Sequence, residues 1–146
     1  MLEFLTVQES CCYDAIVCTW ALMYEQPQKV LNQCQRLLKN GGYLYILVND
    51  QQTLPQIRKI YPKLLIEYVG SINKLMFDLP MPNNAQQLER WAKKAGLKNC
   101  RVTSKKQEFY FTDWNRAAKF VTSTGALAGY DAMLDLKNEK IFNTLV

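Results

Sequence analysis

The sequence contains no histidine among its 146 residues. Histidine is the side chain best suited to proton transfer near neutral pH, so Ser-His-Asp and Cys-His nucleophile systems are excluded. Zinc sites that use histidine are excluded too, and the five cysteines contain no C-x-x-C spacing. We therefore expect no metal site and a chemistry that works without an imidazole base.

Long apolar runs and clustered charges are also scarce. We expect no membrane-spanning segment and no secretory signal, because no apolar stretch approaches the length of a bilayer. The net charge of +5 is spread along the chain, and the longest basic runs are pairs such as Lys93-Lys94. This pattern favours a solvated surface over a nucleic-acid partner. Together with the cysteine pattern, it predicts a cytoplasmic protein with reduced thiols and neither nucleic acid nor membrane as partner.

The composition is that of a globular protein, with 49% hydrophobic and 21% charged residues. A chain of this length can form one compact core. We find no internal repeat, low-complexity tract or linker, so we expect a single domain over residues 1–146.

The most informative stretch is residues 13–50. Residues 15–18 are a short apolar run with β-branched side chains, which predicts a strand buried on both faces. Pro27 marks a helix start, and Lys39 to Gly42 should close the helix end. Residues 43–48 predict a second strand, so the segment reads as a βαβ unit with parallel strands. The apolar face of the helix is formed by Val30, Leu31, Cys34, Leu37 and Leu38.

The remaining elements are read from caps and apolar spacing. Residues 2–7 predict a strand, and prolines 55, 62, 80 and 82 limit the next region to a short helix over 53–60 and a loop or strand pair through 64–79. A helix capped by Asn83 or Asn84 should bury Leu88, Trp91, Ala92 and Ala95 and end at Gly96.

The C-terminal third should contain one strand and two helices. Residues 98–111 predict an extended strand, alone or with a loop. A helix should follow from Thr112 or Asp113 and end before Gly125, burying Trp114, Ala117, Ala118, Phe120 and Val121. The last twenty residues, with Leu127, Tyr130, Met133 and Leu134, predict a short helix and a frayed tail. Strands that alternate with helices make the expected fold α/β.

Residues 13–48 resemble the fourth strand, the following helix and the fifth strand of class I S-adenosylmethionine-dependent methyltransferases. The resemblance is carried by YDAIV (13–17), WAL (20–22) and LLKNGG (37–42), where Asn40 replaces the proline of the family's usual K-P-G-G. Leu79-Pro80, followed by a helix that ends in AGL (95–97), is similar to the family's next helix. The resemblance implies a Rossmann-like sheet with flanking helices and S-adenosylmethionine as cofactor.

A narrower resemblance concerns the acceptor. The segment FVTSTGAL (120–127) is similar to one found in relatives that methylate small carboxylic acids, such as trans-aconitate methyltransferase and the biotin-pathway enzyme that methylates a malonyl thioester. It implies a small-molecule acceptor, with a carboxylate as one candidate. A carboxyl group with a pKa of about 4 is already ionised at neutral pH and needs no general base, which suits a chain without histidine.

The sequence departs from the family pattern in its glycines, which stand at 41, 42, 70, 96, 125 and 129. The family's glycine-rich turn after the first strand and the acidic residue on the next strand are both absent, so we expect a partial domain that lacks the N-terminal cofactor-binding strands. Such a fragment would bind the cofactor weakly or not at all and could be inactive alone. The alternative is a noncatalytic remnant that serves as an interaction or oligomerising module, pairing through exposed sheet edges.

The site is expected where open α/β sheets bind ligands, at the carboxyl ends of their strands. By resemblance, Cys18, Thr19, Trp20 and Ala21 flank the cofactor. Two further residues, Met23 and Tyr24, would contact the substrate, and no catalytic residue is identified. Packing explains several of these positions equally well, since Trp20 and Leu22 stand at a strand-to-helix corner. Tyr110 and Trp114 could line an acceptor pocket or belong to the core.

Overall fold

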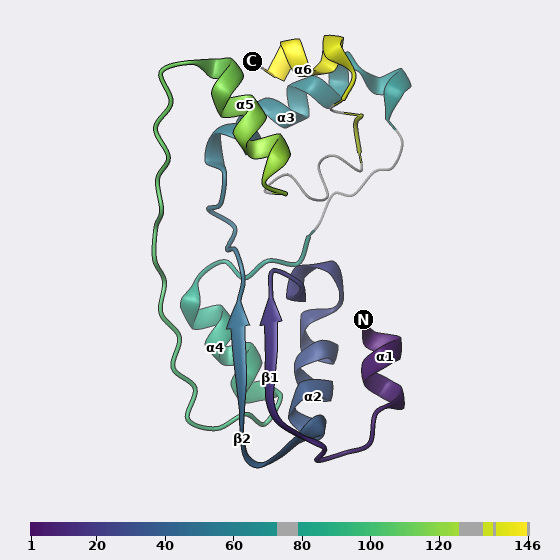
Figure 1. Cartoon of the computed structure of the whole chain (residues 1–146), viewed down its shortest axis with the longest axis vertical. Coiled ribbons are helices and arrows are strands. Elements are labelled where there is room, and N and C mark those ends of the chain that lie inside the picture. The colour runs from purple at the N-terminus through teal and green to yellow at the C-terminus, as the bar shows by residue number, and fades with distance from the viewer. Residues whose placement is uncertain (73–78, 126–132, 136, 146) are drawn as a thin grey trace. The chain divides into compact units, whose positions relative to one another are not determined.

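A computed structural model describes residues 1–72, 79–125, 133–135 and 137–145. The chain divides into two compact units (Figure 1). Unit 1 comprises Met1–Thr53 and Leu79–Lys105, and unit 2 comprises Leu54–Asp78 and Lys106–Val146. The expectation of a single domain stays a prediction.

Unit 1 contains the βαβ unit expected from residues 13–48. Strands β1 (Tyr13–Thr19) and β2 (Leu38–Leu47) pair in parallel, and helix α2 (Pro27–Leu37) connects them. A short 3₁₀ helix, η1 (Leu22–Tyr24), lies between β1 and α2. The predicted unit is thereby confirmed, and the mixed α/β arrangement with its small sheet agrees with a partial methyltransferase fold.

The helix end differs in detail from the expectation. Helix α2 stops at Leu37 and β2 begins at once with Leu38, so the glycine pair lies inside the strand and does not close the helix. Tyr13 pairs with Leu38 but Ala15 pairs with Tyr43, which leaves the intervening residues of β2 as a bulge. Gly41 takes a φ of +82° there, a conformation that glycine adopts without steric cost.

The core of unit 1 lies on one side of the sheet. Helix α2 contributes the four buried residues Val30, Leu31, Cys34 and Leu37, as its apolar spacing predicts. The sheet adds the inward side chains Ile16, Cys18, Leu44 and Ile46. The opposite side of the sheet is exposed, so the prediction of a strand buried on both faces was wrong. The physical reason is that no described element of unit 1 covers that second face.

Residues 2–7 were expected to form a strand, and this was wrong as well. They form helix α1 (Leu2–Val7), which buries Leu5 against α2. Arg36 of α2 donates hydrogen bonds to the carbonyl oxygens of Leu5 (2.8 Å) and Gln8 (3.0 Å) at the end of α1. A cation at a helix C-terminus stabilises the unsatisfied carbonyls there, and this contact is not visible in local propensity.

Helix α4 (Ala85–Lys94) confirms the prediction for residues 83–96. The Asn84 side chain accepts a hydrogen bond from the Gln87 N–H at 3.0 Å, which is the expected N-terminal cap. Leu88 and Ala92 are buried against the core that α2 forms, whereas Trp91 and Ala95 pack against it but are only partly buried. Gly96, with a φ of +87°, follows the last turn as predicted.

Unit 2 is built from helices α3 (Pro55–Glu67), α5 (Trp114–Ser123) and α6 (Glu139–Leu145) and the 3₁₀ helix η2 (Val69–Ser71). Its core contains Tyr61, Leu64, Met133, Leu134 and Ile141. Helix α3 runs well beyond the short helix expected over 53–60, and Pro62 lies inside it. Burial of Tyr61 and Leu64 on either side of Pro62 offsets the roughly 3 kcal/mol that an interior proline costs.

For the rest of unit 2, some of the predictions are confirmed and others are wrong. Helix α5 begins after Asp113, whose side chain accepts from the Asn115 N–H at 2.9 Å, as predicted. Trp114, however, is 73% exposed and not buried. Residues 98–111 form no strand, because an extended segment needs a neighbouring strand for a ladder and none pairs with it among the described residues. Helix α6 agrees with the short helix expected near the C-terminus, while Leu127 and Tyr130 lie outside the described residues.

Candidate functional site

The carboxyl ends of β1 and β2 meet at one edge of the sheet, where Thr19 pairs with Leu47. Trp20 follows β1 directly, and its backbone N–H donates to the Leu47 carbonyl at 2.7 Å. Its indole Nε1 donates to Asn49 Oδ1 at 3.3 Å. The two bonds tie the corner after β1 to the segment that follows β2.

The backbone of Trp20 is strained at this corner. Its φ is +49°, in the left-handed region that bulky residues seldom occupy and that costs about 1–3 kcal/mol. Packing does not compensate, because 53% of the Trp20 surface remains exposed. The hydrogen bonds to Leu47 and Asn49 instead hold the residue, so the explanation of Trp20 as a simple packing residue does not fit the structure.

Cys18 and Ala21 pack against the core of unit 1 and are less accessible than Trp20. The Cys18 side chain is buried in the core of unit 1, and Ala21 packs against the same core while partly exposed. Burial raises the pKa of the Cys18 thiol, an effect that the Ala21 and Leu22 backbone groups partly offset. Burial, with Cys18 as a further cause, raises the pKa of Cys34 to about 11. Both thiols stay protonated at neutral pH and are poor nucleophiles.

The other predicted residues differ in their access to solvent. Thr19 and Tyr24 are exposed, whereas Met23 is buried in η1. Contact between a dissolved substrate and the Met23 side chain would therefore require the corner to open. Leu22 is fully buried, in line with a packing role. Nothing in the structure tests the binding roles assigned to these residues, and they stay predictions.

Sequence reasoning missed Asn49 and Asp50, which follow the end of β2. Asn49 accepts the bond from Trp20, and Asp50 Oδ1 accepts from the Gln52 N–H at 2.9 Å. The next residue, Gln51, donates its N–H to the carbonyl of Pro82 at 3.0 Å. The signal was present in the sequence: polar residues directly after a second parallel strand share an edge with the end of the first.

The described residues contain no group of three or more His, Cys, Asp or Glu side chains that could hold a metal ion. Within the same part of the chain, the helices are too short or too polar to cross a bilayer.

Tyr110 and Trp114, the other aromatic candidates, both belong to unit 2 and are exposed, so the interpretation of them as core residues was wrong.

The N-terminal part of the chain is similar to a known protein family. Residues 5–46 match a family model described as a methyltransferase domain. This segment, less than half of the chain, lies within unit 1 and includes β1, α2 and nearly all of β2. No curated protein and no solved structure matches the chain. Over this segment the chain is similar to a methyltransferase domain, which supports a methyltransferase-like function.

Proposed function

We propose that this chain is part of an S-adenosylmethionine-dependent methyltransferase that acts on a small molecule. The observation that carries the proposal is the parallel β1-α2-β2 unit inside the matched segment, with Trp20 tethered at its carboxyl edge. Open α/β sheets bind ligands at this edge, outside the carboxyl ends of the strands. The strained backbone of Trp20 adds support, because such strain is concentrated at functional sites.

The residues at the edge suit part of the cofactor. S-adenosylmethionine carries a cationic sulfonium and an adenine ring, and an exposed indole can face the cation or stack on the base. When bound, the cofactor supplies an activated methyl group. Trp20 is proposed to contact one face of the cofactor. Cys18, Thr19 and Ala21 form the corner after β1 that positions Trp20. Because the sequence has no glycine-rich turn after a strand, we expect weak binding by this chain alone.

The proposed acceptor is a small carboxylic acid, with Met23 and Tyr24 as its contacts. An ionised carboxylate needs no base, so the protein has only to align the acceptor with the methyl group, and positioning alone contributes several kcal/mol. The absence of histidine supports an acceptor of this kind. We also propose a cytoplasmic location, which five cysteines without a disulfide support.

Isothermal titration of the full chain with S-adenosylmethionine and S-adenosylhomocysteine tests the cofactor site. We expect saturable binding, weakened about 5- to 30-fold by Trp20→Ala, from the 1–2 kcal/mol typical of an indole against a cation. Trp114→Ala is the matched control, since it removes an exposed indole from unit 2 and should leave the affinity unchanged. S-adenosylhomocysteine, whose sulfur is a neutral thioether, should lose less affinity on Trp20→Ala than S-adenosylmethionine if Trp20 faces the sulfonium.

A second candidate function is a noncatalytic interaction module. It is favoured by the exposed second face of the sheet, which is unusual for parallel strands. The titration separates the two proposals. If a folded wild-type chain binds neither ligand at about 1 mM, a concentration that detects weak sites, the methyltransferase proposal for this chain is overturned and the interaction module is left.

A further inference from the structure

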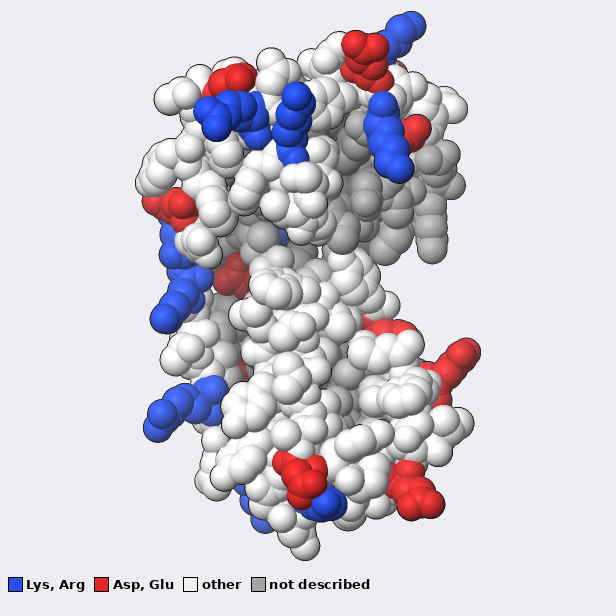
Figure 2. Space-filling view, in the orientation of Figure 1, with Lys and Arg blue, Asp and Glu red and all other residues white. Residues whose placement is uncertain are grey.

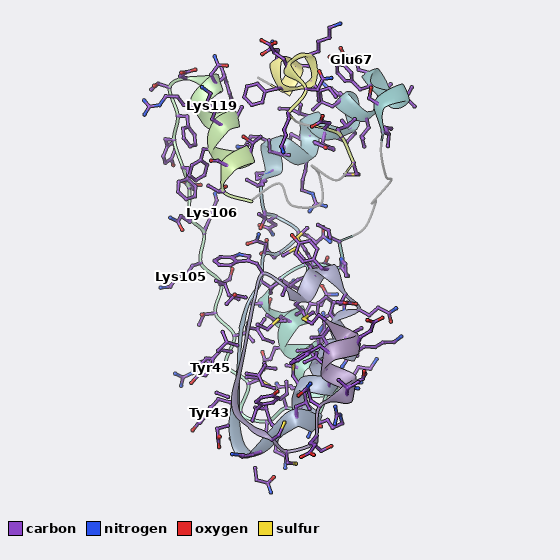
Figure 3. All side chains as sticks on the ribbon, turned by 45° about the vertical axis from the view of Figure 1, so that its right-hand side comes forward. Tyr43, Tyr45, Glu67, Lys105, Lys106 and Lys119 are labelled. Atoms are coloured by element: carbon purple, nitrogen blue, oxygen red, sulfur yellow. The ribbon has the colours of Figure 1, made fainter. Side chains whose placement is uncertain are left out.

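Unit 1 carries an uncovered sheet surface that shares only Thr19 with the proposed cofactor corner. The parallel register places three residue pairs on it: Ala15 beside Tyr43, Val17 beside Tyr45, and Thr19 beside Leu47. All six are exposed, while the alternate residues of both strands face the core. We call these six residues the outer face. Figure 3 shows Tyr43 and Tyr45 on the side of the sheet away from α1 and α2.

The outer face is apolar and aromatic. Val17 is 68% exposed, Tyr43 65%, Tyr45 57% and Leu47 48%. The two tyrosine rings stack along β2 with centroids 6.2 Å apart, so they form one continuous surface. Neither hydroxyl forms a hydrogen bond within the part of the chain that the structure describes. Tyrosine-rich, uncharged patches are typical of the centres of protein interfaces.

The size of the outer face limits what can cover it. With about 200 Å² for a fully exposed aromatic side chain, the six residues present roughly 500 Å². Two such faces would bury roughly 1,000 Å² in total, which is the lower limit for a specific protein–protein contact. The area therefore suits a weak, reversible pair.

The charges around the outer face favour a partner with the same surface. None of the six residues is charged, and at the start of the strands Asp14 and Lys39 neutralise each other at 2.8 Å. In Figure 2 the surface over the strands of unit 1 is largely uncharged, apart from an acidic and a basic group side by side at its lower end. A neutral apolar patch offers no charge for selecting a partner of opposite sign, and it meets no repulsion when it is placed on a copy of itself. Self-complementarity is what a two-fold interface requires.

We propose that the outer face is the interface of a weak homodimer, in which the sheets of two copies pack face to face. The pairing covers a parallel sheet on both sides, which is the usual state of such sheets. It also lets the tyrosine hydroxyls of one copy bond to polar groups of the other. The inference deepens the second candidate function, the interaction module, because both rest on the exposed face of the sheet, and it overlaps the proposed cofactor corner only at Thr19.

Sedimentation equilibrium under reducing conditions tests the proposal with the full chain. We expect a monomer–dimer equilibrium between about 5 and 300 µM, the range for a contact of this size. Tyr45→Lys places an unpaired charge at the centre of the outer face and should weaken the dimer at least tenfold, by about 1.4 kcal/mol or more. Val7→Lys is the matched control, because Val7 is an exposed apolar residue of α1 outside the outer face. It should dimerise like the wild type.

Tyrosine nitration followed by mass spectrometry gives an independent measurement on the unaltered chain. Tyr43 and Tyr45 should react readily in dilute solution and become several-fold protected at high concentration. The highly exposed Tyr110 of unit 2 should react equally at both concentrations. A wild-type chain that stays monomeric over the whole range would overturn the proposal. So would a dimer that Tyr45→Lys leaves intact, since that pair would use another surface such as the open strand edges.

Discussion

Replacing Gly42 by alanine tests the bulge that joins α2 to β2. A Cβ atom at Gly42 would lie 3.0 Å from the carbonyl oxygens of Asp14 and Lys39 and 3.1 Å from a methyl group of Leu38. Favourable separations between carbon atoms are about 3.5–4.0 Å, so these neighbours, two of them backbone atoms, must shift. We expect Gly42→Ala to lower the free energy of unfolding by about 1–3 kcal/mol, the usual cost of overpacking.

Gly41 provides the matched comparison. A Cβ atom there would contact nothing within 4 Å, but the φ of +82° disfavours side chains. Asparagine tolerates this conformation better than most residues. Gly41→Asn should therefore lower the free energy of unfolding less than Gly42→Asn does. Urea unfolding followed by far-ultraviolet circular dichroism measures the difference, and about 1–3 kcal/mol moves the midpoint by roughly 1 M. A Gly42→Ala midpoint equal to that of the wild type would refute the close approach of the Asp14 and Lys39 carbonyls.

Two further predictions concern the core. Leu31→Ala should lower the free energy of unfolding by about 2–5 kcal/mol, whereas Ile66→Ala at an exposed position should stay within about 0.5 kcal/mol; equal urea midpoints would contradict the burial of Leu31. Because the pKa of Cys34 is raised from 9.0 to about 11, its stabilising contribution is present below pH 9 and is lost as the pH rises towards 11, by about 2–3 kcal/mol. The Cys34→Ala variant should lack this part of the pH dependence, and rapid thiol modification of native Cys34 at pH 8 would contradict its burial.

Several elements could be predicted because their signals are local. The apolar spacing of α2, the Asn84 cap of α4 and the Asp113 cap of α5 are each contained within a few neighbouring residues. Local rules failed where a distant contact decided the outcome. Residues 2–7 form a helix because Leu5 packs against α2 and Arg36 bonds to the helix end. Residues 98–111 have no partner strand within the described ranges, which their composition could not reveal.

The candidate site, too, was predictable from the sequence in part only. The order of strand, helix and strand was sufficient to place Trp20 at the carboxyl edge of the sheet, because parallel strands share that edge. Asn49 could have been found by the same rule. The sequence did not show that Cys18 and Met23 are buried while Trp20 is exposed, because these residues are all apolar or weakly polar.

The sequence by itself determined the parallel βαβ unit, the principal capped helices and the absence of imidazole chemistry, since each follows from residue type and spacing. Only the tertiary structure decided which face of the sheet is covered. The alternation of side chains along β2 puts Tyr43 and Tyr45 on one face and Leu44 and Ile46 on the other, and both sets are apolar. Hydrophobic pattern alone cannot choose between two apolar faces. The packing of α2 and its neighbours made that choice and left the outer face open.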